Sequence, residues 1–509
     1  MADTKREIER KYESDESGLP DLTGVAGVRA VIDKGVANLD AVYYDTADER
    51  LAKASITLRR RTGGSDAGWH LKVPVAPGVR DEIREPLSDT VPRTLAGLVR
   101  SRVREAELLP VVRLRSDRDL RHLVDAEGVL LAEVSVDAVH AERLADDGGT
   151  AQWTEIEVEL ADDGDPVFLD KVEKRLRKAG VRPSSSASKL ARALAETAPK
   201  KAKKRKAPVP PPEPEPEPEP ETAGDHVLAY VREQRDAILE LDPAVRQDAY
   251  DSVHRMRVAT RRLRSTFRSY GKVLDRTVTD PVGEELRWLA SELGVDRDRE
   301  VMTERLTTVL AELPRTLVSG PVRTRMRTWA NARRGGSRRR LIGVLDSKRY
   351  LALLDTLDAL VAEPPLLPDA AGTPEKVIGK AVRKDFGKVS ALVEEAIGAP
   401  PGADRDLALH EARKKAKRTR YAAEAASPAL GAPARGLAKS MKSLTSLLGE
   451  HQDSVMVRVT LRELSAVAHA AGESSFTYGV LYGREEQRAA AVEAALPGMW
   501  EEIGSEVPV

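Results

Sequence analysis

A run of alternating proline and glutamate divides this chain of 509 residues into two parts. Residues 199–224 read PKKAKKRKAPVPPPEPEPEPEPETAG. Because proline fixes φ and lacks an N–H, the run favours an extended polyproline II spacer over helix or sheet. From Pro208 to Glu221 it would span about 40 Å at about 3.1 Å per residue. We interpret the basic stretch KKAKKRK as linker, with a nucleic-acid or localisation patch as the alternative. The sequence predicts a linker at 199–224 between domains at 1–198 and 225–509.

The composition restricts the class of protein. Absence of cysteine excludes disulfides, thiolate metal sites and cysteine nucleophiles. The first residues, MADTKREIERKY, lack the apolar segment of a secretory signal, and no apolar run approaches the roughly 18 residues of a membrane helix. We therefore expect a cytoplasmic protein with no membrane partner. The net charge is zero, but residues 225–509 carry 45 Lys and Arg against 40 Asp and Glu, which favours an anionic partner for that part.

The part before the linker alternates with period two, which indicates strands. The alternating segments are 7–11, 55–61, 69–73, 112–115, 133–137 and 155–160. Helical patterns are fewer and cover 167–179 and 188–195. The first domain is therefore expected to be α+β with an antiparallel sheet.

The part after the linker has helical periodicity nearly throughout, which predicts an all-α bundle. Breaks are expected at the prolines of 241–243, 280–281, 363–365 and 399–402. The pattern His254-x-x-Arg257-x-x-x-Arg261-x-x-Arg264 returns 156 residues later as His410-x-x-Arg413-x-x-x-Lys417-x-x-Arg420. Leu293-Gly294-x-x-x-Asp298 returns after 155 residues as Leu448-Gly449-x-x-x-Asp453. Two features at nearly one offset predict a duplicated bundle.

Charged side chains cluster on single faces of the predicted strands. Alternation groups Glu7 with Glu9 and Lys11, and Glu155 with Glu157 and Glu159. Other strands group Arg59 with Arg61, and Arg113 with Arg115. These faces could lie in solvent, as in a half-buried sheet. Alternatively, a closed barrel with a polar interior would bring the acidic and basic faces round one lumen. Clustered carboxylates suit Mg²⁺ or Mn²⁺, and Arg and Lys suit phosphate oxygens.

The motif Glu7-Ile8-Glu9-Arg10-Lys11 resembles the ExExK signature of the CYTH family, the triphosphate tunnel metalloenzymes. Segments 58–61, 69–72, 155–160 and 188–192 add to the resemblance, which covers about residues 1–196. It implies an eight-stranded antiparallel tunnel that acts on triphosphates with Mg²⁺ or Mn²⁺. The implied catalytic residues are Glu7, Glu9 and Lys11; the implied metal ligands are Glu7, Glu9, Glu155, Glu157 and Glu159; the implied triphosphate-binding residues are Lys11, Arg59, Arg61, Lys72, Arg113, Arg115 and Lys189. Within 80–87 the inward face could not be assigned.

Reactions within this family diverge, and the resemblance alone leaves the substrate open. Aromatic residues make up 4% of the chain, which favours a substrate without a ring, such as inorganic tripolyphosphate. The implied reaction is attack of a metal-activated water on the terminal phosphoryl group. An organic triphosphate, or a non-catalytic protein that binds polyphosphate or docks on its granules, remains the alternative.

Basic side chains recur along predicted helices of the second part. His254, Arg257, Arg261, Arg264 and Arg268 share one stripe, and no acid lies at i+3 or i+4 to offset its self-repulsion. A second stripe starts at His410, and a third at Lys376 reaches Lys388. Each could be an ordinary solvated face. Two stripes facing each other would instead make a basic channel for a linear polyanion.

The same residues resemble the CHAD domain, an all-helical domain associated with inorganic polyphosphate, over about residues 225–500. The segments 293–298 and 448–453 also match, although the second lacks the arginine found at 297. The resemblance implies that long-chain polyphosphate is a partner and that the protein could associate with its granules. Few aromatics lie among the stripes, which disfavours nucleic acid. The predicted polyphosphate-binding residues are His254, Arg257, Arg261, Arg264, Lys388, His410, Arg413, Lys414, Lys417 and Arg420.

Overall fold

The computed structural model describes residues 3–14, 18–144, 148–198, 220–294, 297–331 and 337–506. The chain divides into two compact units, Met1–Glu215 and Pro216–Val509. Most of the predicted linker, 199–219, lies outside the described residues. Its last residues are helical rather than extended, because Thr222 caps helix α6 (Ala223–Arg246) by accepting from the backbone N–H of Asp225. Among the described helices, none has the length and apolar character needed to cross a membrane.

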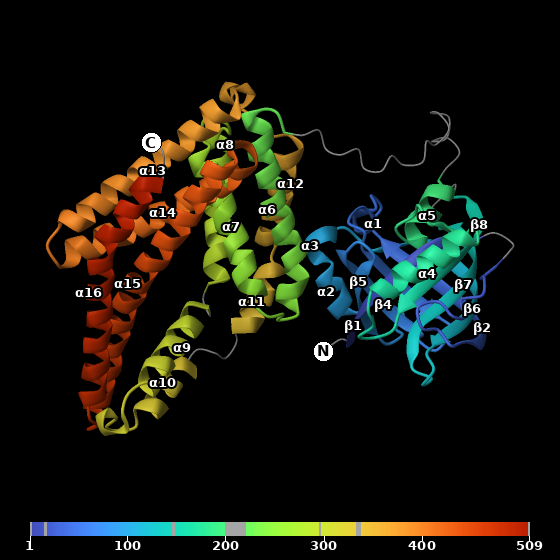
Figure 1. Ribbon diagram of the computed structural model, residues 1–509, viewed down its shortest axis with the longest axis horizontal. Coiled ribbons are helices and arrows are strands. Elements are labelled where there is room, and N and C mark those ends of the chain that lie inside the picture. The colour runs from blue at the N-terminus through green and yellow to red at the C-terminus, as the bar shows by residue number, and fades with distance from the viewer. Residues whose placement is uncertain are drawn as a thin grey trace. The chain divides into compact units, whose positions relative to one another are not determined.

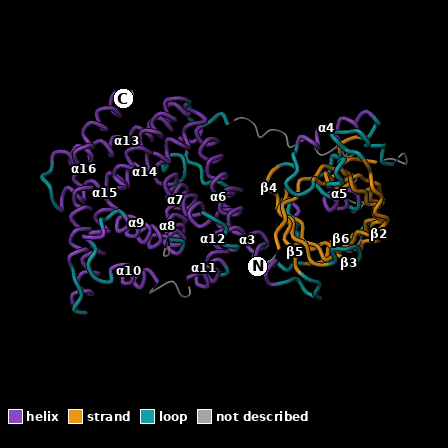
Figure 2. The backbone as a smooth tube through the Cα atoms, turned by 60° about the horizontal axis from the view of Figure 1, so that its bottom comes forward, coloured by secondary structure: helices purple, strands orange, loops and turns teal. Residues whose placement is uncertain are grey.

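The first unit is a closed antiparallel barrel of eight strands, as predicted (Figure 2). The order is β5-β4-β3-β2-β6-β7-β8-β1, and pairing of β1 with β5 closes the ring. A two-residue strand, β9, is added to β1. The strands are β1 Asp3–Ser14, β2 Ala30–Asp45, β3 Thr57–Thr62, β4 Gly68–Ala76, β5 Val79–Glu85, β6 Leu109–Val124, β7 Leu130–Arg143, β8 Thr150–Leu160 and β9 Arg182–Pro183.

Helices cover the outside of the barrel, and this explains its polar interior. On β8, Ile156, Val158 and Leu160 face outward and pack against α4 (Val167–Lys178). On the opposite side, Leu58, Trp69, Leu71 and Ile83 pack beneath α1 (Arg50–Lys53), α2 (Arg93–Leu98) and α3 (Arg100–Val103). Since successive strand residues alternate between faces, burial of the apolar face under helices turns the charged face into the lumen. The closed barrel with a polar interior is thereby confirmed, and the alternative, in which the charged strand faces lie in solvent, is wrong.

A helix, α5 (Lys189–Glu196), lies inside the ring of strands (Figure 2). Ser188 caps it by accepting from the backbone N–H of Ala191 at 3.1 Å. Leu190, Ala193 and Leu194 pack against apolar residues that face inward from β2, β6, β7 and β8. At this end the lumen is filled with apolar side chains, and the charged part begins at the N-terminus of α5.

The second unit is all helical, as predicted (Figure 1). Beyond α6 its helices are α7 Ser252–Ser269, α8 Arg276–Glu292, α9 Arg297–Ala311, α10 Val322–Asn331, α11 Ser337–Leu345, α12 Lys348–Ala362, α13 Pro374–Gly398, α14 Ala403–Leu430, α15 Ala432–Ala470 and α16 Phe476–Glu506, with short 3₁₀ turns at Arg315–Leu317 and Pro368–Ala371. The predicted breaks at 363–365 and 399–402 are helix ends. Those at Pro243 and Pro281 were wrong, because α6 and α8 continue through both prolines.

The second unit is duplicated, in agreement with the sequence repeat. Helices α6, α7 and α8 pack in succession, α13, α14 and α15 do the same, and α7 contacts α14. The two His-led stripes lie on α7 and α14. One apolar core runs through both halves, from Val227 and Leu263 to Ala416 and Leu448.

Candidate functional site

A cavity of about 280 Å³ lies in the barrel and is lined almost wholly by charged side chains. Nine of the predicted residues meet there: Glu7, Glu9, Lys11, Arg59, Arg61, Lys72, Glu157, Glu159 and Lys189. The structure adds Lys5, Tyr43, Arg80, Glu82, Arg84, Arg118 and Glu133 to the lining, with Asp66 at one edge. Residues far apart in the sequence are thus gathered by the alternation of all eight strands of the barrel.

Acidic residues occupy one wall of the cavity. Glu7 and Glu9 come from β1, Glu157 and Glu159 from β8, and these strands are neighbours. Glu9 lies opposite Glu159 in the strand register. Cations of the same wall hold the carboxylates: Lys5 Nζ lies 2.9 Å from Glu159, and Lys11 Nζ contacts both Glu157 and Glu9, the latter at 3.2 Å.

Basic residues come mainly from β3, β4 and β6, whereas β5, which pairs with β1, adds Glu82 as well as Arg80 and Arg84. Arg59 and Arg61 come from β3, Lys72 from β4 and Arg118 from β6. Among the described residues, the Nε atoms of Arg59 and Arg61 are buried and have no hydrogen-bond partner. Burial, followed by repulsion from Arg59 and Arg118, lowers the pKa of Arg61 to about 9. Arg61 also pairs with Asp66, and Arg59 donates to Tyr43. Within the described residues each guanidinium still keeps one buried donor unsatisfied, which favours an anion in this cavity.

Glu7 differs from Glu9 and Glu157, two other carboxylates of the acidic wall, in the direction in which its pKa is shifted. It is buried, and its carboxylate lies 2.5 Å from Lys72 Nζ. Burial raises the pKa of Glu7 to about 7, and the charges of Glu82 and Glu159 act in the same direction against the effect of Lys72. Glu9 differs, because Lys11 and Lys72 outweigh its burial and lower its pKa. Glu7 is therefore the carboxylate of this wall whose charged form is disfavoured, mainly by burial, whereas cations keep the pKa values of Glu9 and Glu157 low.

A second carboxylate cluster lies beside the cavity. Oxygen atoms of Asp137, Glu155 and Glu157 lie within 4.8 Å of one another. The ammonium of Lys189 sits among them, at 2.9 Å from Asp137 and 2.6 Å from each glutamate. Glu155 also accepts from Trp153 Nε1 at 2.6 Å and does not line the cavity. Lys189, predicted to bind phosphate, is thus engaged by three carboxylates, and Asp137 is a member that sequence reasoning did not assign.

The predicted phosphate contacts of Arg113 and Arg115 require correction. Arg113 points outward and pairs with Asp40, and Arg115 is exposed on the same face of β6. Val112 and Leu114 face inward instead, towards the apolar packing around α5. By alternation, the β6 residue that reaches the cavity is Arg118, which pairs with Asp137 at 2.7 Å and Glu157 at 3.1 Å. The prediction assigned the charged residues Arg113 and Arg115 to the inner face of β6. In the structure the apolar residues Val112 and Leu114 form that face.

Glu82 and Arg84 were missed because the inward face of β5 was not assigned. Glu82 is almost wholly buried, accepts from His70 Nδ1 at 2.9 Å, and lies 3.7 Å from both Lys72 and Arg59. These cations lower its pKa despite burial, together with the His70 hydrogen bond. Burial lowers the pKa of His70 to about 4, so its imidazole is neutral. Ile83 could have indicated the inward face of β5. Because it packs outward under α2, its neighbour Glu82 must face inward.

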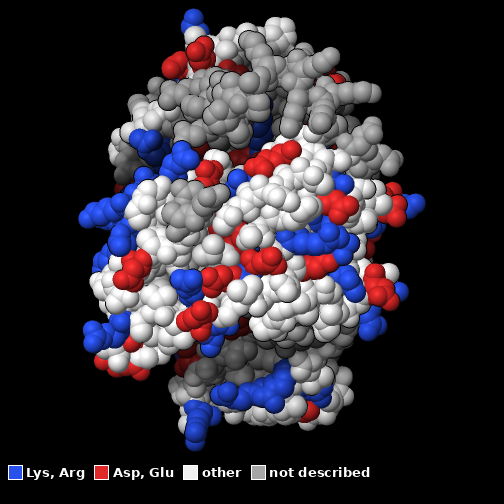
Figure 3. Space-filling view, turned by 90° about the vertical axis from the view of Figure 1, so that its right-hand side faces the viewer, with Lys and Arg blue, Asp and Glu red and all other residues white. Residues whose placement is uncertain are grey.

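The helical unit has its own cavity, of about 1030 Å³, between the two stripes. Eight predicted residues line it: His254, Arg257, Arg261, Arg264, His410, Arg413, Lys414 and Lys417. Further lining cations are Arg268, Arg287, Arg305, Lys415 and Arg418, whereas Glu411 and Asp453 are the acids among the described lining residues. The cavity is therefore strongly basic. Figure 3 shows a face of the molecule on which acidic and basic side chains are interspersed.

Cations crowd one another in the helical cavity. Burial, followed by the charges of Arg261 and Arg413, lowers the pKa of Lys417 to about 7. Among the described residues, Nε of Arg264, Nε of Arg413 and Nδ1 of His410 are buried without a hydrogen-bond partner. Buried donors and mutual repulsion are both relieved by an anion.

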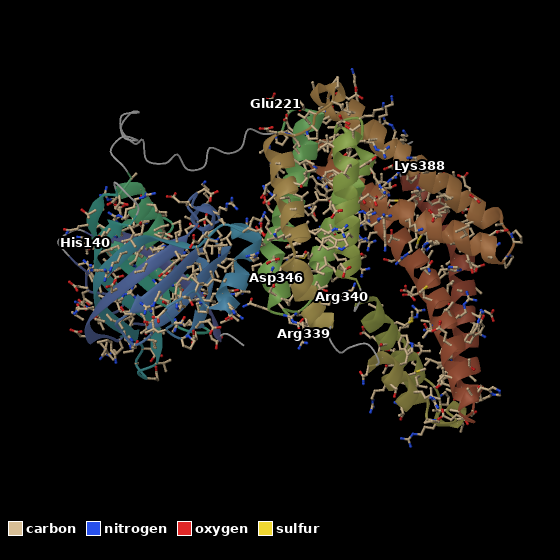
Figure 4. The ribbon with its side chains drawn as sticks, turned by 180° about the vertical axis from the view of Figure 1, so that it is seen from behind. His140, Glu221, Arg339, Arg340, Asp346 and Lys388 are labelled. Carbon is tan, nitrogen blue, oxygen red and sulfur yellow. The ribbon has the colours of Figure 1, made fainter. Side chains whose placement is uncertain are left out.

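Two predicted residues lie outside this cavity. Lys388 lies on α13 (Figure 4), where it pairs with Asp385 at 3.2 Å. Arg420 pairs with Glu424 one turn further along α14, at 2.8 Å. Because α14 turns by 100° per residue, Arg418 rather than Arg420 extends the stripe into the cavity. Both corrections arise because helical spacing in the sequence allows more than one set of residues to form a stripe. The structure decides which set faces the cavity.

The chain matches two family models. Residues 5–194 match the CYTH domain and residues 229–462 match the CHAD domain. It is 40% identical over 510 residues to uncharacterized protein Rv2226 of Mycobacterium tuberculosis (strain ATCC 25618 / H37Rv), covering 96% of this chain and 95% of that protein. Uncharacterized protein MT2285 of strain CDC 1551 / Oshkosh matches to the same extent.

Solved structures resemble each unit separately. PptA from Streptomyces chartreusis is 20% identical, with a TM-score of 0.46, and the match covers 55% of this chain and 99% of that chain. The CHAD domain from the plant Ricinus communis is 24% identical, with a TM-score of 0.43, covering 55% and 92%. The putative adenylyl cyclase HpAC1 from Hippeastrum, described as having a dominant triphosphatase activity, is 19% identical, with a TM-score of 0.24, covering 38% and 96%. With a relative 40% identical along nearly its whole length and both family models matched in order, the chain belongs to the family of proteins in which a CYTH domain precedes a CHAD domain.

Proposed function

We propose that the barrel hydrolyses inorganic tripolyphosphate with Mg²⁺ or Mn²⁺, and that the helical domain binds inorganic polyphosphate. The observation that carries the first part is the uneven distribution of charge in the barrel cavity, where carboxylates concentrate on β1 and β8 with Lys5 and Lys11 among them. Carboxylates of β1 and β8 face guanidinium and ammonium groups of β3, β4 and β6 across about 280 Å³. This arrangement matches a metal–phosphate complex, whose cation and anionic oxygens need opposite partners.

The carboxylates fit a divalent cation. Glu7, Glu9 and Glu159 offer oxygen ligands on one wall, and burial, aided by the charges of Glu82 and Glu159, raises the pKa of Glu7 to about 7. A bound Mg²⁺ or Mn²⁺ would activate a water and offset charge on the phosphoryl oxygens. Glu7 would then bind the metal deprotonated, with its oxygen released from Lys72. Lys72, Arg59 and Arg61 would bind phosphate oxygens and hold the chain in line for attack.

The lining favours a substrate without a ring. Tyr43 is the one aromatic residue among the described residues that line the cavity, and its hydroxyl accepts from Arg59 at 3.3 Å. A base or a thiamine ring would need an apolar or stacking surface that this lining does not offer. At about 280 Å³ the cavity is also at the lower end of ligand pockets, which are about 300–1,000 Å³.

Polyphosphate binding by the helical domain rests on the basic cavity between α7 and α14. Cations from both repeats line it, and the buried donors of Arg264, Arg413 and His410 are unsatisfied within the described residues. Its volume of about 1030 Å³ exceeds that of the barrel cavity several-fold, which suits a longer chain of phosphates. No positioned nucleophile accompanies the histidines among the described lining residues, so we assign this cavity to binding.

The test is phosphate release from tripolyphosphate, ATP and thiamine triphosphate, each with Mg²⁺ and with Mn²⁺. We expect metal-dependent release with tripolyphosphate far ahead, abolished by Glu7→Gln with Glu9→Gln. Glu13→Gln is the matched control, because Glu13 lies on β1 but does not line the cavity. Release from no triphosphate would refute the enzyme and leave a polyphosphate-binding protein. Faster release from ATP or thiamine triphosphate would refute the inorganic substrate.

A further inference from the structure

A histidine and two carboxylates converge at a place in the helical domain that lies outside the basic cavity. They are Asp406 from α14, His451 from α15 and Glu493 from α16, and one ligand atom of each lies within 4.8 Å of the others. None of the three lines the polyanion cavity. We propose that this cluster is a zinc site that joins the three helices.

The distances within the cluster are also those expected of metal ligands. His451 Nε2 lies 3.3 Å from Asp406 Oδ1 and 3.3 Å from Glu493 Oε1. The contact to Glu493 is a long hydrogen bond, and one Nε2 proton cannot serve both acids well. In a tetrahedral zinc site with bonds of about 2.0–2.1 Å, neighbouring ligand atoms lie about 3.3–3.4 Å apart. The two separations from Nε2 equal edges of such a tetrahedron, and the third pair of ligand atoms lies within 4.8 Å.

Burial and the surrounding contacts also suit a metal ligand set. The His451 side chain is 2% exposed, so its imidazole is held in place with Nε2 directed at the two acids. The second oxygen of Glu493 accepts from Arg405 at 2.7 Å, and Arg405 donates in turn to the carbonyl of Ala399 at 2.8 Å. Such outer contacts orient a ligating carboxylate. Asp406 is 36% exposed, which provides an entry path and room for a water as fourth ligand.

The cluster belongs to one repeat alone. At the offset of the two repeats, Asp406 corresponds to Tyr250 and His451 to Asp296 in the sequence. Tyr250 is 99% exposed and offers no carboxylate. A general role in fixing the duplicated bundle would call for the same residues twice. The second repeat has instead acquired an imidazole and an acid that face each other, and α16 supplies a third ligand.

The chemistry of the ligands favours Zn²⁺ over the ions expected in the barrel. Imidazole nitrogen with two carboxylates suits a borderline transition metal, whereas Mg²⁺ prefers oxygen ligands alone. Occupancy would tie α16 to the helices that carry the polyanion cavity, since His410 lies one turn after Asp406 on α14. This site is independent of the activity proposed for the barrel.

The test measures zinc stoichiometry on the full chain by equilibrium dialysis, with millimolar Mg²⁺ present to occupy the barrel. We expect Asp406→Asn and His451→Gln each to bind one zinc fewer per chain than wild type. Asp404→Asn, an exposed charge two residues from Asp406, should leave the stoichiometry unchanged. Zinc should also raise the thermal midpoint of the wild-type helical domain by several degrees, and not that of the two variants.

Equal zinc binding by wild type and both variants would overturn the proposal, and so would an equal loss in Asp404→Asn. Far-UV circular dichroism checks the fold of each protein. Glu493→Gln keeps the shape of the side chain, and its loss of one zinc would support the site even if His451→Gln failed to fold. Preference for Mn²⁺ over Zn²⁺ at this site would refute the assigned metal.

Discussion

The guanidinium of Arg257 lies against Gly294, where an added Cβ would fall 2.6 Å from Nη2. Arg413 repeats this contact against Gly449, at 3.5 Å from the equivalent position. Each glycine follows the leucine of the repeated Leu-Gly motif, and each arginine lines the basic cavity. The space that a cavity arginine needs therefore explains the glycine of the first motif, whereas at Gly449 the arginine would meet a Cβ at ordinary contact distance.

This contact makes glycine substitutions informative. Gly294→Ala should displace Arg257 and weaken polyphosphate binding about tenfold, the effect of losing one charged contact. Gly449→Ala should have a smaller effect, because its Cβ would meet Arg413 at ordinary contact distance. Gly283→Ala in α8 is the control, since nothing lies within 4 Å of its Cβ, and it should stabilise the domain by about 0.5–1 kcal/mol. Affinity by calorimetry and unfolding in urea give both quantities; a larger loss from Gly449→Ala would contradict the explanation.

Arg118 and Arg115 lie on opposite faces of β6 and form a matched pair. Arg118→Gln should lower kcat/KM for tripolyphosphate by about 100-fold, because it removes a cation from the cavity wall. It should also destabilise the barrel by about 3 kcal/mol, since Asp137 and Glu157 lose a buried partner. Arg115→Gln should change neither quantity by more than about 0.5 kcal/mol. Steady-state kinetics and thermal unfolding of both variants test this, and equal effects would place β6 in the opposite register.

Lys417 should make polyphosphate binding depend on pH. Its pKa is lowered to about 7 by burial and by neighbouring cations, and a bound polyanion favours the charged form. Affinity should therefore be greatest below pH 7 and fall several-fold as pH rises through 7 towards 8.5, with proton uptake on binding. Lys417→Arg should abolish the part of this dependence above pH 7, because guanidinium stays charged. Calorimetry in buffers of different ionisation enthalpy measures the proton uptake. If Lys417→Arg leaves the pH profile of affinity unchanged, the pH dependence belongs to another group.

Long polyphosphate should resist displacement by nucleic acid. Donors in the helical cavity are aimed into a space with few aromatic residues, so bases would gain little by stacking. Duplex and single-stranded DNA at equal phosphate concentration should leave most polyphosphate bound to the full chain. Displacement by either would remove the polyphosphate assignment. Competition followed by fluorescence of a labelled polyphosphate gives the answer in one titration.

The barrel and its acidic wall were predictable because 155–160 of β8 alternates charged and apolar residues without a break, and β1 carries Glu7, Glu9 and Lys11 on one face. Strand β6 was less clear, because its apolar residues face the α5 packing while those of β8 face the outer helices. Alternation gives two faces but does not say which is inside. Pro243 and Pro281 were misjudged because the packing of Val245 and Val282 in the core carries each helix past a missing hydrogen bond. Asp406, His451 and Glu493 could not be associated from sequence, since only the packing of three helices brings them together.

The position of α5 inside the barrel has a consequence for the length of chain that the cavity can process. Leu190, Ala193 and Leu194 seal one end of the lumen with apolar packing, so a phosphate polymer cannot thread through it. Whatever enters at the charged end must leave by the same opening. Only a terminal segment of a long chain could then reach the carboxylates, and cleavage would shorten polymers from their tips rather than cut them in the middle.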